Sequence, residues 1–268
     1  MALVNKIIPF SCIDGPGNRT AIFFQGCNLR CTYCHNPETI NRCISCGRCV
    51  ATCPTEALRV ENKKVIWNKE KCTECDECIK MCPHLSSPKT KEYSVDELFQ
   101  EIKRISPFIQ GITVSGGECT LNADFLVALF KRVKEELNLT CFVDTNGIID
   151  LSEQEELVNL TDQFMLDVKA IDEVEHGKVT GLSNQTVLKN LHYLLDKNKL
   201  YEVRTVVAPN LDNEKTIKAV AEIVGNRCKY KLNAYRKYGV RKEGLDLHGE
   251  VGPSEEEMQY YRSLTESV

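Results

Sequence analysis

Three cysteines near the amino terminus have the spacing of an iron–sulfur site that leaves one iron free. They are Cys27, Cys31 and Cys34, and a turn with Pro37 follows directly. A [4Fe–4S] cluster usually has four cysteine ligands, so three thiolates leave one iron open to a substrate or cofactor. Structural zinc sites usually repeat CxxC pairs. The CxxxCxxC spacing therefore favours an iron–sulfur cluster over zinc or a chance grouping.

Eight further cysteines form two copies of a second pattern, CxxCxxCxxxCP. This is the pattern of bacterial two-cluster ferredoxins, in which the fourth cysteine of each run ligates the other cluster. Two complete copies with both prolines make zinc a poor alternative. We expect residues 39–90 to be a ferredoxin-like insert, and residues 1–38 and 91–268 to form the main domain. The ligands expected for the two clusters are Cys43, Cys46, Cys49 and Cys82, and Cys53, Cys72, Cys75 and Cys78.

The composition predicts a cytoplasmic protein whose cysteines are metal ligands. The chain has 268 residues, fifteen cysteines and a formal net charge of −4. Disulfide frameworks belong to short secreted chains, and no secretory signal is apparent here. The net charge does not favour nucleic acid, and no apolar run reaches the length of a membrane span. Four cysteines match no ligand spacing, and we expect them to be buried thiols: Cys12, Cys119, Cys141 and Cys228.

The elements that must position the first three cysteines alternate between strands and helices. Six strands are expected, at residues 20–25, 109–115, 140–143, 164–166, 203–207 and 231–234. Helices are expected at residues 94–105, 122–137, 186–197 and 215–224, and from Ser152 and Ser254 onward. Such alternation favours a parallel sheet with right-handed crossovers. The chain outside the insert is short for eight units, so we expect an open (β/α)6 partial TIM barrel, with a doubly wound sheet as the alternative.

Polar or charged groups follow each of the expected strands. In a barrel of this kind, chemistry gathers at the carboxyl ends of the strands. Each group alone could be an ordinary turn, because Gly, Asn, Asp and Pro are turn residues. A complete row of them indicates a site. The groups lie at residues 27, 116–118, 144–147, 167–169, 209 and 235–236.

The cysteine loop and its surroundings resemble the activating enzymes of glycyl radical enzymes, within the radical S-adenosylmethionine (SAM) superfamily. The resemblance rests on residues 27–39, on Tyr33 before the third cysteine, and on Asp14-Gly15-Pro16-Gly17 with Arg19. It implies that the open iron binds the amino and carboxylate groups of SAM. Reduction would then yield methionine and a 5′-deoxyadenosyl radical that takes a hydrogen atom from a glycine of a partner enzyme. It also implies flavodoxin or ferredoxin as the electron donor.

The same resemblance assigns roles to residues of the strand ends. It places Gly116, Gly117 and Glu118 at the SAM amino group, Asn146 toward the ribose, and Lys169 near the SAM carboxylate. Tyr33 belongs to the cofactor site as well. Arg204 joins this polar shell. The resemblance also implies a monovalent cation beside SAM, with the surrounding residues Asp144, Thr145, Met165 and Asp167.

A six-stranded arc would leave a lateral gap for a loop of the partner. We expect Asp14, Gly15 and Gly17 to border that gap and to contact the partner. One position departs from the family, because Arg236 stands where a histidine is typical. Arginine can stack on a purine but cannot act as a neutral base. The basic residues between 227 and 242 are expected to be a solvated face rather than a docking surface.

Two other functions stay open from the sequence. One is a radical SAM enzyme that acts on a small molecule or a peptide, against which the Asp14 turn and His35-Asn36-Pro37 speak. The other is an electron carrier without enzymatic activity, in which the third cluster is only another relay. Formation of 5′-deoxyadenosine from SAM would separate this carrier from the two enzymes.

Overall fold

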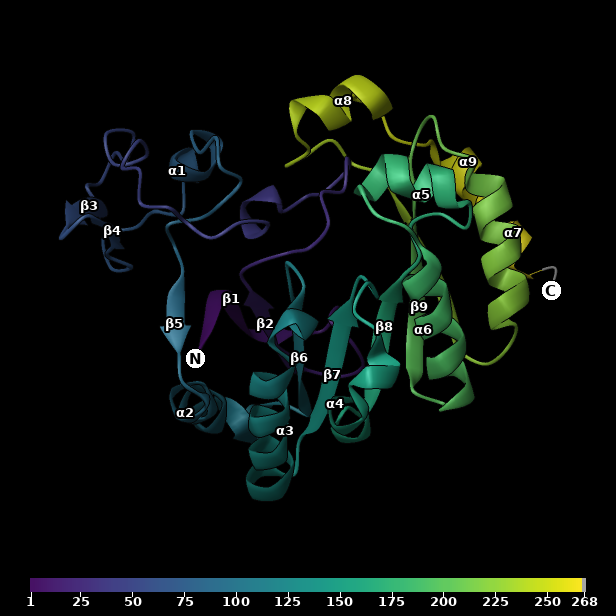
Figure 1. Cartoon of the computed structure of the whole chain (residues 1–268), viewed down its shortest axis with the longest axis horizontal. Coiled ribbons are helices and arrows are strands. Elements are labelled where there is room, and N and C mark those ends of the chain that lie inside the picture. Colours follow the sequence, from purple (N-terminus) through teal and green to yellow (C-terminus); the bar gives the residue numbers. More distant parts are fainter. Residues whose placement is uncertain (267–268) are drawn as a thin grey trace.

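The structure is a computed structural model that describes residues 1–266, and one eight-stranded sheet organises it (Figure 1). The strand order is β10-β9-β8-β7-β6-β2-β1-β5. The strands from β2 to β10 in this order are parallel and follow one another along the chain. They are the six expected strands, so the α/β fold with a parallel sheet is confirmed. Their bounds are β2 Arg19–Phe24, β6 Gly111–Gly116, β7 Thr140–Thr145, β8 Gln163–Asp167, β9 Leu200–Val207 and β10 Lys229–Ala234.

Two antiparallel strands extend the sheet beyond β2. β1 (Ala2–Ser11) pairs with β2 on one side and with β5 (Lys91–Tyr93) on the other. None of the six expected strands covers residues 2–11, so β1 is a strand that the sequence analysis missed. Pro9 and Lys6 interrupt the apolar pattern there, and both lie next to irregularities in the pairing with β2. A proline is tolerated in a strand at such irregular positions.

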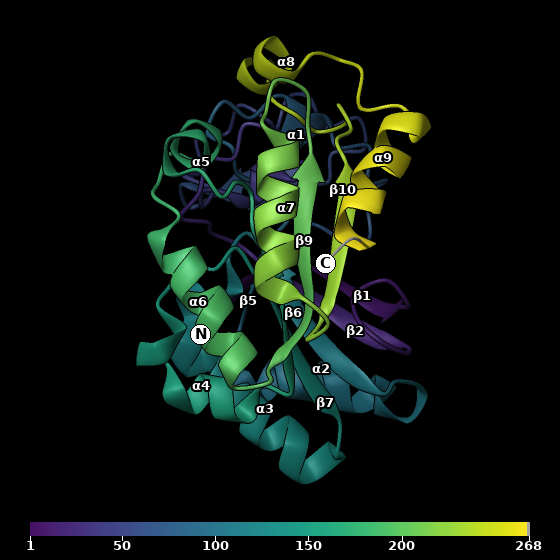
Figure 2. The ribbon, with the colours of Figure 1, turned by 90° about the vertical axis from the view of Figure 1, so that its right-hand side faces the viewer.

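Helices cover the outer face of the sheet (Figures 1 and 2). Six match the expected ones, and the capping boxes at Ser94 and Ser254 are present. Short 3-10 turns instead precede α3 and α4, so Asn122 and Ser152 do not cap those helices. Two helices, α5 (Glu173–Thr180) and α8 (Lys242–His248), were not expected. The other bounds are α2 Val95–Ile105, α3 Ala123–Leu137, α4 Glu155–Leu160, α6 Gln185–Asp196, α7 Asn213–Val224 and α9 Glu255–Glu266.

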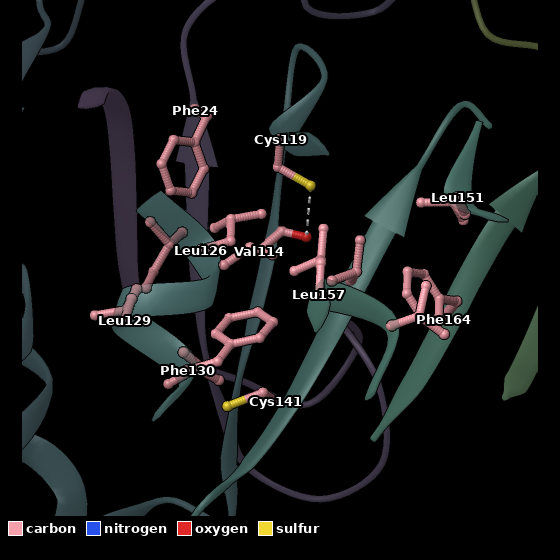
Figure 3. Packing of buried hydrophobic residues seen from close by; sticks show 14 of the residues in the cluster. Phe24, Val114, Cys119, Leu126, Leu129, Phe130, Cys141, Leu151, Leu157 and Phe164 are labelled. Carbon is pink, nitrogen blue, oxygen red and sulfur yellow. Dashed lines mark hydrogen bonds between the residues drawn. The ribbon is translucent and has the colours of Figure 1, made fainter. Parts of the chain in front are cut away.

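The main core lies between the outer face of the sheet and these helices. Figure 3 shows Leu126, Leu129 and Phe130 of α3 against Val114 of β6. Because side chains alternate along a strand, the neighbours of these apolar residues face the concave side. Cys119 and Cys141 are buried in the core, as expected. Cys228 is half-buried, and Cys12 is exposed on the β1–β2 turn, so the expectation for Cys12 was wrong.

Residues 39–90 lie beside the sheet at the upper left of Figure 1. Their regular elements are short: a hairpin of β3 (Leu58–Glu61) and β4 (Lys64–Trp67), and α1 (Glu77–Lys80). The two ends of the segment meet in a parallel bridge between Asn41 and Ser86. Gln25 Nε2 donates to the carbonyl oxygen of Asn41 (2.5 Å), which ties the segment to the end of β2.

Candidate active site

A cavity of about 330 Å³ lies at the carboxyl ends of the parallel strands. It is bounded on one side by the loop after β2 and on the other by the ends of β6 to β10. Ser115, Val206 and Asn233 line it although the sequence did not single them out. The cavity brings together most of the predicted site residues: Cys27, Cys31, Tyr33, Cys34, Gly116, Gly117, Asp144, Thr145, Asn146, Asp167, Lys169 and Arg204.

The three cysteines share one buried loop, residues 27–34, which we call the cluster loop. Burial raises the pKa of Cys27 to about 12 and that of Cys34 to about 11, and it also raises the pKa of Cys31. The N–H of Leu29 donates to Cys27 Sγ (3.4 Å). Burial favours the neutral thiol, whereas metal ligation needs the thiolate. Thiolates in this loop therefore require a strong positive charge beside them, such as iron supplies.

Two glycines at the end of β6 allow its backbone to pack against β2 and against the residue before the cluster loop. Gly116 has φ +120°, and a Cβ there would lie 2.2 Å from the backbone nitrogen of Phe24. A Cβ on Gly117 would lie 2.2 Å from the carbonyl oxygen of Gly26. Larger residues cannot take these positions without moving the backbone. The backbone of β6 is thus held against the start of the cluster loop.

Four charged residues form a network along the concave ends of β7, β8 and β9. Arg204 Nη2 donates to Asp144 Oδ1, and Arg204 Nε donates to Asp167 Oδ1 (3.1 Å). Lys169 Nζ donates to Asp167 Oδ2 (3.0 Å), and Ser115 Oγ donates to Asp144 Oδ2 (3.0 Å). Each of the four carboxylate oxygens therefore already has a hydrogen-bond donor.

The charges of this network set its protonation states. Burial alone would raise the pKa of Asp167, but Lys169 and Arg204 together hold that pKa below its ordinary value. Burial likewise opposes the charge of Lys169, yet Asp167 raises the pKa of Lys169 well above its usual range. The Lys169 side chain is only 11% exposed. A lysine that is charged and shielded in this way can bind an anionic group in the cavity.

Three predicted cofactor residues do not line the cavity. Glu118 is buried, and its carboxylate accepts from Thr120 Oγ1 (2.7 Å), Thr145 Oγ1 (2.8 Å) and the N–H of Asn146 (2.7 Å). It thus joins the ends of β6 and β7. Met165 is also buried, and the Arg236 side chain is exposed. Their roles toward a cofactor stay predictions.

Asn146 contacts the cluster loop directly. Its Nδ2 donates to Asn28 Oδ1 (3.0 Å) and lies 3.7 Å from Cys27 Sγ. The sequence placed this residue toward a ribose, and the structure adds a contact with a cysteine of the loop. Asn146 thereby links the end of β7 to the loop after β2.

A segment near the carboxyl terminus, which we call the strap (residues 235–249), lies on the cluster loop. Arg241 Nη2 donates to the carbonyl oxygens of Arg30 (3.0 Å) and Cys31 (3.3 Å). From the other side, the N–H groups of Arg30 and Thr32 donate to the carbonyl oxygens of Thr180 (3.0 Å) and Val179 (2.8 Å), where α5 ends. The loop backbone is therefore held between α5 and the strap.

The strap also fixes the side chains of the loop. His248 is buried, and its Nδ1 donates to the carbonyl oxygen of Pro209 (2.8 Å). Because that ring nitrogen must donate, Nε2 is left to accept from Thr32 Oγ1 (2.8 Å). A Cβ on Gly244 would lie 1.8 Å from the carbonyl oxygen of Thr32, so only glycine allows this approach. The basic residues between 227 and 242 were expected to form a solvated face. Arg241 does not belong to such a face, because its side chain is only 18% exposed.

Two smaller cavities lie in the insert, each lined by four cysteines. In each cavity, three cysteines come from one run and the fourth from the other run. That these sets ligate two clusters stays a prediction. Within the described residues, no group of three or more His, Cys, Asp or Glu side chains is arranged to hold a metal ion. The cysteines lining the first cavity are Cys43, Cys46, Cys49 and Cys82, and those lining the second are Cys53, Cys72, Cys75 and Cys78.

The turn with Asp14, Gly15 and Gly17 lies at the amino end of β2, whereas Cys27 follows its carboxyl end. The Asp14 carboxylate accepts from Ser11 Oγ (2.5 Å), and its carbonyl oxygen accepts from Thr113 Oγ1 (2.5 Å). β1 and β5 separate β2 from the edge of the sheet. That this turn borders the gap and contacts a partner stays a prediction.

Comparisons with known proteins agree with this site. A family model described as the radical SAM superfamily matches residues 21–223. The trans-4-hydroxy-L-proline dehydratase activating enzyme of Clostridioides difficile is 31% identical, over 99% of this chain and 96% of the relative. The indoleacetate decarboxylase activating enzyme of Tractidigestivibacter scatoligenes is 30% identical, over 99% and 95%. The pyruvate formate-lyase-activating enzyme of Streptococcus mutans is 32% identical, over 83% and 72%.

Solved structures support the fold. QueE from Escherichia coli superposes with a TM-score of 0.53 at 14% identity, over 98% of this chain and 91% of QueE. The fold and the matched residues define a radical SAM protein. Within that superfamily, the chain belongs to the family of glycyl radical enzyme activating enzymes, as its relatives at 30% identity and above establish. No helix in residues 1–266 is long and apolar enough to cross a membrane.

Proposed function

We propose that this chain cleaves SAM reductively and directs the resulting radical to a glycine of a partner glycyl radical enzyme. One observation carries the proposal. The cavity joins three cysteines of one loop, of which Cys31 is buried and Cys27 and Cys34 are half-buried, to a charged network on the ends of β7, β8 and β9. The named activities of the relatives support it, because several are activating enzymes.

The residues present fit a [4Fe–4S] cluster with one open iron. Cys27, Cys31 and Cys34 supply three thiolates from one loop. When bound, such a cluster supplies an electron and an open coordination site for the amino and carboxylate groups of SAM. Lys169 presents a shielded ammonium for the carboxylate of SAM, and the Gly116-Gly117 backbone leaves room beside it. The chain thus binds and orients the cofactor, and the cofactor carries the chemistry.

The insert, in this proposal, holds two further [4Fe–4S] clusters that pass electrons to the cluster loop. The eight cysteines line its two cavities in the crossed arrangement of bacterial ferredoxins. Flavodoxin or ferredoxin is the proposed electron donor. A chain with this many thiolate ligands belongs in the cytoplasm, where thiols stay reduced.

The monovalent cation implied by the resemblance does not fit the residues as they stand. Each of the four oxygens of Asp144 and Asp167 accepts a hydrogen bond from Arg204, Lys169 or Ser115. Thr145 Oγ1 donates to Glu118, and Met165 is buried. Arg204 already supplies positive charge between the two carboxylates. We therefore propose no step through a monovalent cation.

Deuterium transfer tests the proposed reaction. A glycyl radical enzyme chosen from the genes that neighbour the gene for this protein would be labelled with α-deuterated glycine and incubated anaerobically with the reduced activase and SAM. Mass spectrometry should find deuterium in 5′-deoxyadenosine, and the Cys34→Ala variant should form none. Deoxyadenosine without deuterium would point to another substrate, and no deoxyadenosine at all would favour an electron carrier.

A further inference from the structure

Trp67, the only tryptophan of the chain, has a buried donor without an acceptor. It lies at the end of β4, and its ring is half-buried. Its indole Nε1 is fully buried and has no hydrogen-bond partner. An indole N–H can only donate, and leaving such a group buried and unpaired is destabilising. A missing acceptor is therefore to be sought in whatever fills the space beside the ring.

That space is the second cavity of the insert. Trp67 lines it together with the four cysteines Cys53, Cys72, Cys75 and Cys78. The ring also packs in a small apolar cluster that includes Leu58 and Cys78. Sulfur atoms of an iron–sulfur cluster are hydrogen-bond acceptors, and donors to them tune the reduction potential. A cluster in this cavity would supply the acceptor that the protein itself does not.

The backbone donors of the two cavities match each other. In the first cavity, the N–H of Ser45 donates to Cys43 Sγ (3.4 Å). In the second, the N–H of Ala57 donates to Cys53 Sγ (3.2 Å). Each cavity thus has a backbone N–H that donates to a ligand sulfur, although the two accepting cysteines are the first and the fourth of the same run.

The hydroxyl groups match as well. Ser86 Oγ lies 3.4 Å from Cys82 Sγ, and Thr55 Oγ1 lies 3.8 Å from Cys53 Sγ. The ammonium of Lys89 beside the second cavity is paired with Asp76 at 2.5 Å, which offsets its charge.

The indole N–H of Trp67, at the second cavity, has no counterpart among the β4 side chains that line the first cavity. Val65 stands two residues before Trp67 on the same face of β4, and it lines the first cavity. Its side chain cannot donate a hydrogen bond. The hairpin thus presents an apolar group to one cavity and an N–H to the other.

We propose that Trp67 donates its indole N–H to a sulfur of the cluster held by Cys53, Cys72, Cys75 and Cys78, and so raises the reduction potential of that cluster above that of its neighbour. The proposal rests on the proposed function of the insert. Reduction adds negative charge to the cluster, and an N–H donor stabilises the more negative form. The electron therefore settles first on the second cluster.

A redox titration followed by electron paramagnetic resonance tests the proposal. Trp67→Phe keeps the aromatic packing and removes the donor, and Val65→Leu is the control beside the first cavity. Trp67→Phe should move one insert cluster to a lower potential and leave the other unchanged. Val65→Leu should keep the two potentials in their wild-type order. Unchanged potentials in a Trp67→Phe protein that holds about 12 iron atoms would overturn the proposal.

A second measurement needs no variant. With ¹⁵N-labelled tryptophan in the wild-type chain, hyperfine spectroscopy of the reduced protein should detect coupling between one cluster and the labelled indole nitrogen. Absence of that coupling in a protein with its full iron content would refute the hydrogen bond from Trp67 but leave the ferredoxin-like insert in place. A chain that holds only about 4 iron atoms would instead refute the ferredoxin-like insert, and this inference with it.

Discussion

Removing the Arg241 side chain should make the cluster loop release its iron. Arg241 donates to the carbonyl oxygens of Arg30 (3.0 Å) and Cys31 (3.3 Å), and its side chain is only 18% exposed. Hydrogen bonds from a charged group contribute about 1.5–3 kcal/mol each, and the longer of these two lies at the low end. For Arg241→Met we therefore expect a loss of about 3–4.5 kcal/mol in the stability of the closed loop. This corresponds to about a 160- to 2000-fold rise in the population of open loop, at 1.36 kcal/mol per factor of ten.

The assay is the anaerobic transfer of iron to a coloured chelator. In Arg241→Met, about 4 of about 12 iron atoms should leave faster, while the iron of the insert leaves at the wild-type rate and serves as the internal standard. Arg241→Lys keeps the positive charge but not the two donors of the guanidinium group. Its rate of iron release should therefore lie between those of the wild type and Arg241→Met. Arg227→Met is the matched control, since exposed Arg227 also donates to a backbone carbonyl but lies outside the strap. Iron release from Arg241→Met at the wild-type rate would refute the role of the strap.

Three further outcomes are expected. Replacing the three cysteines of the cluster loop by Ala should lower iron from about 12 to about 8 atoms per chain and abolish deoxyadenosine formation; retention of 12 would contradict the ligand assignment. Excising residues 39–90 should leave dithionite-driven SAM cleavage but remove cleavage driven by flavodoxin, and equal rates from flavodoxin would refute the relay. SAM binding by the wild type, measured calorimetrically, should not change when choline replaces potassium. Arg204→Met removes the hydrogen bonds from Arg204 to Asp144 and Asp167, so SAM binding by this variant should become potassium-dependent. Potassium dependence in the wild type would refute the idea that Arg204 supplies the positive charge in place of a bound cation.

The sequence predicted the features that depend on local patterns. The six parallel strands are short apolar runs bounded by turn residues, and each is visible within a window of ten residues. β1 was missed because Lys6 and Pro9 interrupt such a run, and its stability comes from pairing on both sides. α5 shows almost no amphipathic pattern, so no periodic signal marks this helix in the sequence.

The parts of the site that were missed depend on contacts between distant residues. Arg241 and Cys31 are 210 residues apart in the sequence, and only the folded chain brings them into hydrogen-bond contact. His248 likewise joins Thr32 and Pro209 from separate elements. The donor of Trp67 is recognisable only once its nitrogen is found buried without an acceptor. Glycines at 239 and 244 were the available signal for the strap, because a close backbone approach often requires them.

The turn with Asp14, Gly15 and Gly17 is predicted to contact the partner, and a variant there can separate docking of the partner from cofactor chemistry. Asp14→Ala should keep iron, SAM binding and dithionite-driven deoxyadenosine formation, because Asp14 does not line the cavity. It should nevertheless fail to activate the partner if its carboxylate receives backbone N–H groups of the bound segment. Full activation by Asp14→Ala would remove this turn from the docking site.

The most direct test of the account is the glycyl radical itself. The wild-type activase, SAM and a reductant would be mixed anaerobically with a glycyl radical enzyme chosen from the neighbouring genes, and the sample examined by electron paramagnetic resonance. The account predicts the doublet of a glycyl radical on the partner, and its absence when the three cysteines of the cluster loop are replaced by Ala. No doublet with a wild-type chain that carries its full iron and cleaves SAM would contradict the activase function.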